Sequence, residues 1–415
     1  MRTTQSGVYL LAAMALVCIL QSADRNLFAV AIQGIKAEFR VTDTQLGAIS
    51  GPAYAIILSL AGIPLARLAE RVGRCRLIAG SVAAWSICTS ATAGASGIFS
   101  LAASRITVGI GEAGAGPAVQ SLLAARFSSR GRSGAMAVMY AGSYLGIFVG
   151  LALGGFLVEH VGWRRAFLCM GIPGLVLAPL VLLTVEEPPK AANLLGNTTI
   201  GDVVTILRTP GVLHFLAMFC LMGFATFGTT AWAPTFYSRQ YGMDVERAGT
   251  VVGIVIGGGA VVGSLVGGLL TKCFRESDRD AEATFILWTL GVAIPAALGV
   301  FVVVDRALSV ILLLFSTVVS CFPAGPIYAL LHGLVEVRHR ATAAAVTALA
   351  ANLIGGLGPV FIGVLSDQIG GDRPKALRIA LLAANSFYLW AFWHTYRVLA
   401  TYRGRCGQLP ASAST

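Results

Sequence analysis

Charged side chains are scarce in this chain of 415 residues: 12% are charged, 56% are hydrophobic, and the mean hydropathy is +0.79. Soluble domains carry about twice that share of charge, so the composition excludes an ordinary soluble protein. Apolar runs of about 20 residues, the length of a helix that crosses a bilayer, recur along the whole sequence. The sequence therefore predicts an all-α membrane protein.

The residue patterns of metal, disulfide and catalytic sites are also missing. The eight cysteines are scattered, with no CxxC and no cysteine–histidine pair at metal spacing. The five histidines form no cluster, and no Ser/His/Asp, Cys/His or phosphate-loop arrangement is present. The net charge of +11 is not gathered into a basic tract with aromatic residues, which argues against a nucleic-acid partner. We expect no enzyme activity, no metal site and no bound cofactor.

Twelve apolar segments are long enough to span a membrane. We place them at about 7–32, 43–66, 76–97, 98–124, 133–158, 163–184, 210–237, 247–270, 282–304, 307–331, 341–364 and 375–397. The first begins like a signal peptide, but its apolar run continues to Ile32 without a small-residue cleavage site, so we interpret it as a span.

The longest break between spans divides the chain into two similar halves. It opens with Glu-Glu-Pro-Pro, a helix stop, and holds a short amphipathic stretch suited to the membrane surface. Because residues 44–71 align with 247–273, we infer repeated halves, which are typical of secondary transporters. We predict a six-helix bundle at 1–184, a cytoplasmic linker at 185–209, a second six-helix bundle at 210–397 and a cytoplasmic tail at 398–415.

The basic residues predict the orientation. Of the 30 lysines and arginines, 18 fall on the side that holds both ends of the chain, which places both termini in the cytoplasm. Small residues recur every fourth position in four spans, as in the ladder Gly142, Gly146, Gly150 and Gly154. This spacing stacks them on one helix face, where backbones approach closely. A sliding contact between the halves and ordinary tight packing are both open interpretations.

The span at 98–124 carries two charged residues, Arg105 and Glu112. Seven residues apart on a helix, they share one face about 10 Å apart along the axis. Charges in a span are costly unless they line a bundle interior or a wet cavity, and there they indicate function. Burial raises the pKa of a carboxylate and a nearby arginine lowers it. This competition could make the protonation of the carboxylate switchable, as a proton-coupled carrier requires. A structural ion pair between helices is the alternative.

The first span contains Asp24 and Arg25, whose side chains point about 100° apart on a helix. One can face a cavity while the other pairs elsewhere; a snorkelling pair at a helix end is the alternative. We take Asp24 and Glu112 as candidates for proton coupling. The candidate substrate contacts are Arg25, Glu112, Thr230, Tyr140 and Tyr144, with packing as the alternative for the last three.

The turn between the second and third spans is a candidate cytoplasmic gate. It holds Arg67, Glu70, Arg71 and Arg74. Glu70, near a helix end among arginines, can latch one conformation by charge pairing. Anchoring by positive charges on the cytoplasmic side is a second interpretation, and the two are compatible.

Several stretches resemble a known family. ARLAERVGRCR (66–76) resembles the loop between the second and third helices of the major facilitator superfamily, with Ala66 replacing the usual glycine and Glu70 the usual aspartate. SRITVGIGEA (104–113) resembles the fourth-helix motif. DRNLFAVAIQGIKAEF, DTQLGAISGPAYA and RATAAAVTALAANLIGGLGPVFIGVLSD are similar to the Spinster-like branch. Organic-anion permeases of the superfamily share the Asp-Arg and Gly-Glu-Ala elements.

The resemblance implies the major facilitator fold of twelve helices in two pseudo-symmetric six-helix bundles. It implies a bacterial homologue, a monomer, that spans the inner membrane many times. Animal Spinster proteins are linked to sphingosine-1-phosphate and lysophospholipids, and bacterial relatives to protons. The expected activity is therefore proton-coupled transport of an anionic, lipid-like molecule by rocker-switch alternating access, with a proton gradient in place of a cofactor.

By position, the resemblance also assigns roles to residues. Asp24, Arg25 and Glu112 would couple protons and gate substrate, and Arg105 would be a structural or charge partner. Glu70 and Arg71 would belong to the cytoplasmic gate. Two other functions stay open: an organic-anion or drug transporter on the same fold, and an uncoupled lipid facilitator or scramblase.

Overall fold

A computed structural model describes residues 7–187, 199–274 and 281–406 of the chain. These ranges consist of helices joined by turns, and they contain no strand, which confirms the expected all-α fold. The elements are α1 (Gly7–Phe39), α2 (Asp43–Ser50), α3 (Pro52–Val72), α4 (Arg74–Thr92), α5 (Ile98–Ala113), α6 (Ala115–Arg126), α7 (Ser129–Thr184), α8 (Ile200–Arg208), α9 (Val212–Tyr241), α10 (Val245–Gly253), η1 (Ile254–Gly258), α11 (Gly259–Phe274), α12 (Ala281–Gly299), α13 (Arg306–Ser320), α14 (Ala324–Leu334), η2 (Val337–His339), α15 (Arg340–Gly355), α16 (Leu357–Ile369) and α17 (Pro374–Cys406).

Each of the twelve predicted spans coincides with a described helix, a part of one, or helices that follow closely on each other. Glycines break the second, fourth and eleventh spans, at Gly51, Gly114 and Gly356. The fifth and sixth spans join within α7 at Gly162, whose φ of +82° is a conformation that glycine adopts readily. By length and composition, nine segments of the described ranges could cross a membrane, and one of them holds both of these spans. The protein therefore crosses a membrane many times.

The described residues form two compact units. Unit 1 lies within Met1–Leu194, Thr230–Gly258 and Pro359–Ala380, and unit 2 within Leu195–Thr229, Gly259–Gly358 and Leu381–Thr415. Unit 1 thus joins the first six spans to one end of α9, to α10 with η1, and to most of α16 with the start of α17. The predicted bundle and linker boundaries stay predictions, since most of the linker and the end of the predicted tail lie outside the described residues.

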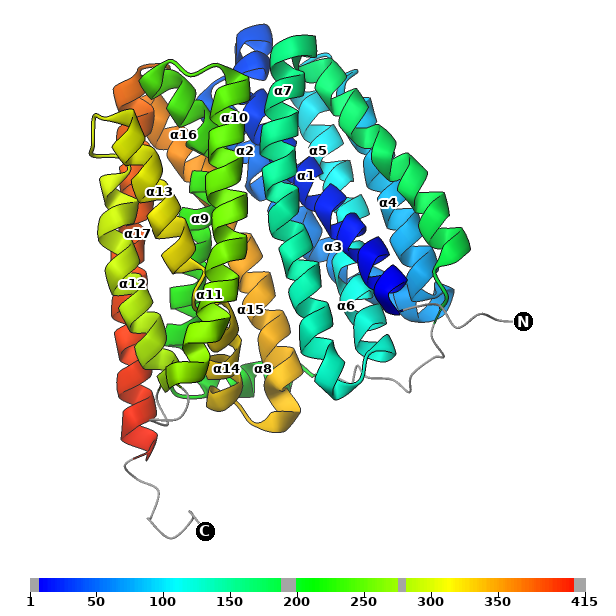
Figure 1. The fold of residues 1–415 in the computed structure, drawn as a ribbon, viewed down its shortest axis with the longest axis vertical. Helices are drawn as coiled ribbons and strands as arrows, with labels where there is room; N and C mark the ends of the chain where they lie inside the picture. Colours follow the sequence, from blue (N-terminus) through cyan, green and yellow to red (C-terminus); the bar gives the residue numbers. More distant parts are fainter. Residues whose placement is uncertain (1–6, 188–198, 275–280, 407–415) are drawn as a thin grey trace. The chain divides into compact units, whose positions relative to one another are not determined.

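In unit 1, the glycine ladder of the fifth span packs α7 against α1 (Figure 1). A Cβ atom at Gly146 would lie 2.4 Å from the carbonyl oxygen of Ile19, and one at Gly150 would lie 2.3 Å from that of Ala23. Only glycine fits such a close approach. This ladder is therefore packing within the first six spans, and not a contact between the predicted halves.

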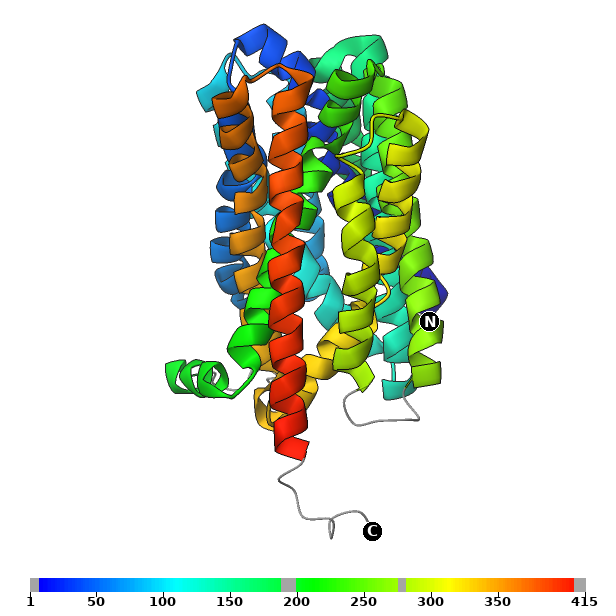
Figure 2. The same ribbon diagram turned by 90° about the vertical axis from the view of Figure 1, so that its left-hand side faces the viewer.

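In unit 2, α8 runs across the direction of the longer helices, while α17 continues as one long helix (Figure 2). Thr199 caps α8: its hydroxyl accepts the Asp202 N–H, and Asp202 accepts the Thr199 N–H at 2.8 Å. The backbone N–H and hydroxyl of Thr199 hold the pKa of Asp202 below its usual range. Ile206 of α8 is buried, and Leu207 packs against the same core, so the predicted amphipathic stretch is a capped helix with one apolar side.

Candidate functional site

The centre of unit 1 contains a buried carboxylate, Glu112 of α5, bound by side chains of α1 and α3. Gln21 and Arg25 lie one helical turn apart on α1 and therefore share a face. Arg25 Nη2 donates to Glu112 Oε2 at 2.9 Å, and Gln21 Nε2 donates to the same oxygen at 3.4 Å. The Tyr54 hydroxyl of α3 donates to it as well. We call these four residues, Gln21, Arg25, Tyr54 and Glu112, the Glu112 cluster.

The two charges of this cluster differ in their exposure. The Glu112 side chain is fully buried, whereas 40% of the Arg25 side chain is exposed. Arg25 also lies over the ring of Tyr54, with its guanidinium carbon 5.0 Å from the ring centroid. Within the described part of the chain, Glu112 Oε1 has no hydrogen-bond partner. Arg25 is thus the member of the pair that a ligand can reach, and Glu112 is a shielded anion with one free oxygen.

Glycines explain how a glutamate fits into the middle of unit 1. A Cβ atom at Gly111 would lie 2.7 Å from the backbone nitrogen of Trp85 in α4, and one at Gly109 would lie 3.4 Å from Tyr54. The absent side chains let α5 approach α3 and α4 closely. This close approach brings the Tyr54 hydroxyl to Glu112 and keeps the carboxylate buried.

Asp24 points away from its neighbour Arg25, as expected for adjacent residues of a helix. It is buried and accepts a hydrogen bond from the Thr89 hydroxyl of α4. Its other oxygen, Oδ1, has no partner among the described residues. Asp24 and Glu112 therefore occupy separate positions, one toward α4 and one toward α3.

Arg105 is also buried, although no described carboxylate lies within 4.0 Å of it. Its guanidinium carbon lies 5.5 Å from the Phe28 ring centroid and 5.8 Å from that of Tyr54. Such cation–π contacts stabilise a desolvated cation by about 2 kcal/mol. Its Nε and Nη1 atoms have no partner in the described ranges. Arg105 thus adds a buried positive charge beside the Glu112 cluster without an ion pair of its own.

The remaining predicted substrate contacts lie on other helices. Thr230 is half-buried on α9, while Tyr140 and Tyr144 lie one turn apart on α7, where Tyr140 is 45% exposed. The geometry does not assign them to the Glu112 cluster, and their role stays a prediction.

The predicted cytoplasmic gate contains an unexpected carboxylate contact. Arg67 and Arg71 are exposed, Arg74 is half-buried, and the Glu70 side chain lies outside the described part, so its pairing stays a prediction. Glu187, which follows α7, accepts the backbone N–H groups of Arg74 at 2.9 Å and Cys75 at 2.7 Å. Glu187 therefore caps the first turn of α4, where unpaired N–H groups favour an anion.

A second charged cluster lies at the other end of unit 1, around Asp43. This carboxylate is fully buried at the start of α2, and it accepts hydrogen bonds from Lys36 Nζ at 2.6 Å and from Ser366 Oγ at 2.8 Å. Arg239 of α9 donates to both Asp43 oxygens, at 2.7 and 2.9 Å. The bidentate contact is the strongest geometry for an arginine and a carboxylate. Asp43 thus joins α1, α2, α9 and α16.

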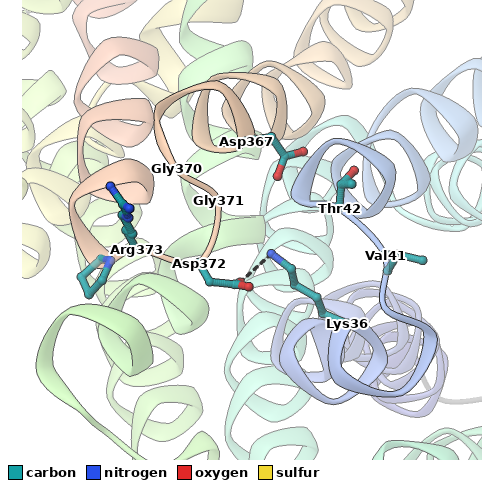
Figure 3. Close-up of a pocket in the computed structure, with 9 residues that line it drawn as sticks. Lys36, Val41, Thr42, Asp367, Gly370, Gly371, Asp372 and Arg373 are labelled. Carbon is teal, nitrogen blue, oxygen red and sulfur yellow. Dashed lines mark ion pairs between the residues drawn. The ribbon is translucent and has the colours of Figure 1, made fainter.

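Two further aspartates complete this Asp43 cluster. Asp367 of α16 accepts the N–H groups of Asp43 at 3.1 Å and Thr44 at 2.8 Å, and so caps α2. Asp372 accepts Lys36 Nζ at 2.6 Å. Beside the cluster lies an open depression of about 690 Å³ (Figure 3), lined by Lys36, Val41, Thr42, Asp367, Gly370, Gly371, Asp372, Arg373 and Pro374. We define the Asp43 cluster as Lys36, Asp43, Arg239, Ser366, Asp367 and Asp372.

Sequence reasoning missed Tyr54, Gln21 and the whole Asp43 cluster. Gln21 has a signal, since it is polar and lies one turn before Arg25. Tyr54 is the one aromatic residue of the predicted span 43–66, which is a weaker sign. The Asp43 cluster joins residues more than 300 positions apart, such as Asp43 and Ser366, and no local pattern marks such a contact.

Comparisons with known proteins agree with this architecture. A family model of the Major Facilitator Superfamily matches residues 14–359. An MFS-type efflux pump of Mycolicibacterium smegmatis (strain ATCC 700084 / mc(2)155) is 34% identical over 376 residues, or 89% of this chain and 87% of that protein. Protein spinster homolog 1 of Xenopus laevis is 24% identical over 396 residues, or 88% of this chain and 73% of that protein.

A solved structure is similar over nearly the whole chain. The crystal structure of a bacterial homolog to the human lysosomal transporter Spinster, in an inward-facing and occupied conformation, matches with a TM-score of 0.83 at 24% identity, covering 96% of this chain and 97% of that one. The chain belongs to the major facilitator superfamily and is a membrane transporter, not an enzyme. The predicted similarity to Spinster proteins is confirmed.

Proposed function

We propose that this protein is a proton-coupled transporter of an anionic amphiphile, and that the Arg25–Glu112 ion pair is its switch. The observation that carries the proposal is the unequal exposure of the pair: Glu112 is buried, and Arg25 is accessible. An anionic group that enters would compete with Glu112 for the Arg25 guanidinium, whose planar donors suit phosphate or carboxylate.

The sign of the coupling follows from charge. With all four groups ionised, Asp24, Arg25, Arg105 and Glu112 sum to zero. A proton on Glu112 would leave one net positive charge and free Arg25 for the substrate. A proton and a monovalent anion therefore favour each other's binding, which by linkage makes the anion bind more tightly as pH falls. The unpartnered Glu112 Oε1 is an atom that can take this proton without breaking a hydrogen bond.

Two helical segments connect this switch to the Asp43 cluster. Arg25 and Lys36 lie 11 residues apart on α1, and Asp43 and Tyr54 lie 11 residues apart across α2 and α3. In the continuous helix α1, eleven residues are about three turns, or about 16 Å, so Arg25 and Lys36 share a face. The second pair lies on either side of the break at Gly51. In our proposal the carrier alternates by a rocker-switch movement. The Asp43 cluster holds the extracytoplasmic end closed in one of the two states. Arg67, Glu70, Arg71 and Arg74 would form the gate on the cytoplasmic side.

The orientation and setting are parts of the same proposal. The excess of basic residues at one set of helix ends supports cytoplasmic termini. A monomer in the inner membrane of a bacterium, driven by the proton gradient without a cofactor, is the simplest assembly for this mechanism. Lysophospholipid or a sphingosine-1-phosphate-like molecule is the substrate class favoured by the similarity to Spinster proteins. Thr230, Tyr140 and Tyr144 are proposed further contacts.

A second candidate is the export of an organic anion or drug. It is favoured by the relative of 34% identity, which is named an efflux pump. In both candidate functions Arg25 binds the anionic group of the substrate. The substrates differ because only the amphiphile has a long acyl chain. Competition between a long-chain amphiphile and a small aromatic carboxylate for the purified protein would therefore separate them.

The test of the proposed function is substrate binding to the purified protein between about pH 5 and 9, a range in which buried carboxylates and histidines titrate. Lysophospholipid, sphingosine-1-phosphate and a small organic anion are compared on wild type and on Glu112→Gln. We expect wild type to bind one amphiphile more tightly at low pH than at high pH. We expect the variant to bind the same amphiphile with a high affinity that does not change with pH. Binding that is independent of pH in wild type would refute the proton-switch role of Glu112.

A further inference from the structure

Two histidines that are far apart in sequence meet in unit 2. His214 lies in the first turn of α9, and His394 lies in the second half of α17. Their Nδ1 atoms are 2.9 Å apart, although 180 positions separate the residues. The sequence therefore shows no histidine cluster, because this pair depends on the packing of α9 against α17.

The separation of the two nitrogens suits a two-nitrogen chelate. One Nδ1 carries a proton and donates it to the lone pair of the other, since two protonated Nδ1 atoms could not approach so closely. For a metal ion about 2.0–2.1 Å from both nitrogens, the angle between the two metal–nitrogen bonds would be about 90°. Square-planar or tetragonal ions such as Cu²⁺ and Ni²⁺ bind neighbouring ligands at that angle. Tetrahedral Zn²⁺ would need a separation of about 3.3 Å.

The surroundings of the pair suit an ion that keeps water ligands. Both histidines are partly exposed, and no described carboxylate lies within 4.0 Å of either. Within the described ranges, no group of three or more histidine, cysteine or acidic ligands occurs, so the remaining positions of a bound ion would be filled by water. Arg397 is the charged side chain that acts on both imidazoles, and its repulsion would weaken the binding of a cation.

We propose that His214 and His394 form a binding site for a divalent transition-metal ion, with Cu²⁺ preferred. Cu²⁺ has the highest affinity of the divalent first-row ions for such ligands. When the ion binds both Nδ1 atoms, the donor imidazole moves its proton to Nε2, and both rings stay neutral. The ion replaces the hydrogen-bonded proton as the link between α9 and α17. The proposal does not depend on the proposed transport function.

Neighbouring tryptophans give the site its own optical reporter. The Trp393 ring centroid is 5.7 Å from that of His214 and 4.7 Å from that of His394. Bound Cu²⁺ at this distance would quench Trp393 fluorescence. Trp390, whose ring centroid is 6.0 Å from that of His394, is a second reporter. The Trp393→Phe variant removes the nearer reporter without replacing either ligand, and so separates optical from binding effects.

The test titrates the full-length, tag-free protein with Cu²⁺ and follows both tryptophan fluorescence and the Cu²⁺ electron paramagnetic resonance spectrum. We expect one ion per chain, with hyperfine coupling to two nitrogens. His214→Gln and His394→Gln should each weaken binding by roughly tenfold or more, because one of two preorganised ligands is lost. The matched control, His160→Gln, removes an exposed histidine of α7 and should leave the affinity unchanged.

Several results would overturn the assignment. If His214→Gln and His394→Gln bind Cu²⁺ as tightly as wild type, the pair is not the site. The same conclusion follows if His160→Gln alone removes the signal. Should both pair variants fail to fold, the wild-type spectrum decides: a signal with fewer than two coupled nitrogens contradicts the proposal. Trp393→Phe should keep the two-nitrogen spectrum and lose part of the quenching, and loss of the spectrum would also count against it.

Discussion

Arg25 donates to Glu112 at 2.9 Å across 87 positions of the sequence, joining α1 to α5 inside unit 1. A buried carboxylate that loses its only cationic partner costs about 3–5 kcal/mol. A ligand can therefore take Arg25 away only if something else compensates Glu112. A proton is the simplest such compensation, and this requirement links proton binding to ligand binding in one ion pair.

The first prediction concerns the cation. Arg25→Gln keeps a polar side chain but removes the positive charge, and a charge-assisted hydrogen bond contributes about 1.5–3 kcal/mol. We expect the dissociation constant of the anionic substrate to rise roughly 10- to 100-fold, measured by isothermal titration calorimetry. Arg25→Lys, which keeps the charge but loses the bidentate geometry, should fall in between. An Arg25→Gln protein with wild-type affinity would exclude Arg25 from the binding site.

The second prediction concerns the Asp43 cluster. Asp43→Asn leaves Lys36 and Arg239 against a neutral group, although Asp372 still pairs with both. The protein should therefore melt at a lower temperature by scanning fluorimetry, with a loss of at most about 3–5 kcal/mol.

A double-mutant cycle tests the partner in the same cluster. Asp43→Asn deprives the buried Arg239 of its bidentate partner, and the double variant removes that cation as well. Asp43→Asn with Arg239→Gln should therefore be less destabilised than the sum of the two single changes. Asp305→Ala, which removes only the N-cap of α13, provides the comparison and should cost about 1 kcal/mol. Additive melting shifts for Asp43 and Arg239 would show that the two residues do not act together.

The third prediction concerns the cap on α4. Glu187→Ala leaves the N–H groups of Arg74 and Cys75 without their acceptor, a loss of about 0.5–2 kcal/mol for a helix cap. Amide hydrogen exchange over residues 74–78 should accelerate, measured by mass spectrometry. Glu187→Gln, which keeps one acceptor oxygen, is the matched comparison and should accelerate exchange less than Glu187→Ala. Equal exchange in wild type and Glu187→Ala would mean that the cap does not stabilise this turn.

The helices could be predicted from the sequence because membrane-spanning segments carry their own signal in length and apolarity. The predicted spans 98–124 and 43–66 correspond to α5 with α6 and to α2 with α3. The breaks within them, at Gly114 and Gly51, were not predicted, since a glycine in a small-residue helix indicates close packing as readily as a kink.

The charged residues of the Glu112 cluster could be predicted because charges are rare in such spans. Asp24, Arg25, Arg105 and Glu112 stand out for this reason alone. Their partners could not be predicted, because Tyr54 and Thr89 are ordinary side chains that acquire a role only through the packing of α3 and α4 against α1 and α5. The contact between His214 and His394 depends on packing in the same way.

The most direct test of the proton switch is transport in proteoliposomes with the identified substrate. An imposed proton gradient should drive wild-type protein to accumulate the substrate above its equilibrium concentration. Glu112→Gln should bind the substrate and allow it to equilibrate, but should not accumulate it, because no proton moves with it. Uphill accumulation by Glu112→Gln at the wild-type rate would contradict the account and place the coupling elsewhere.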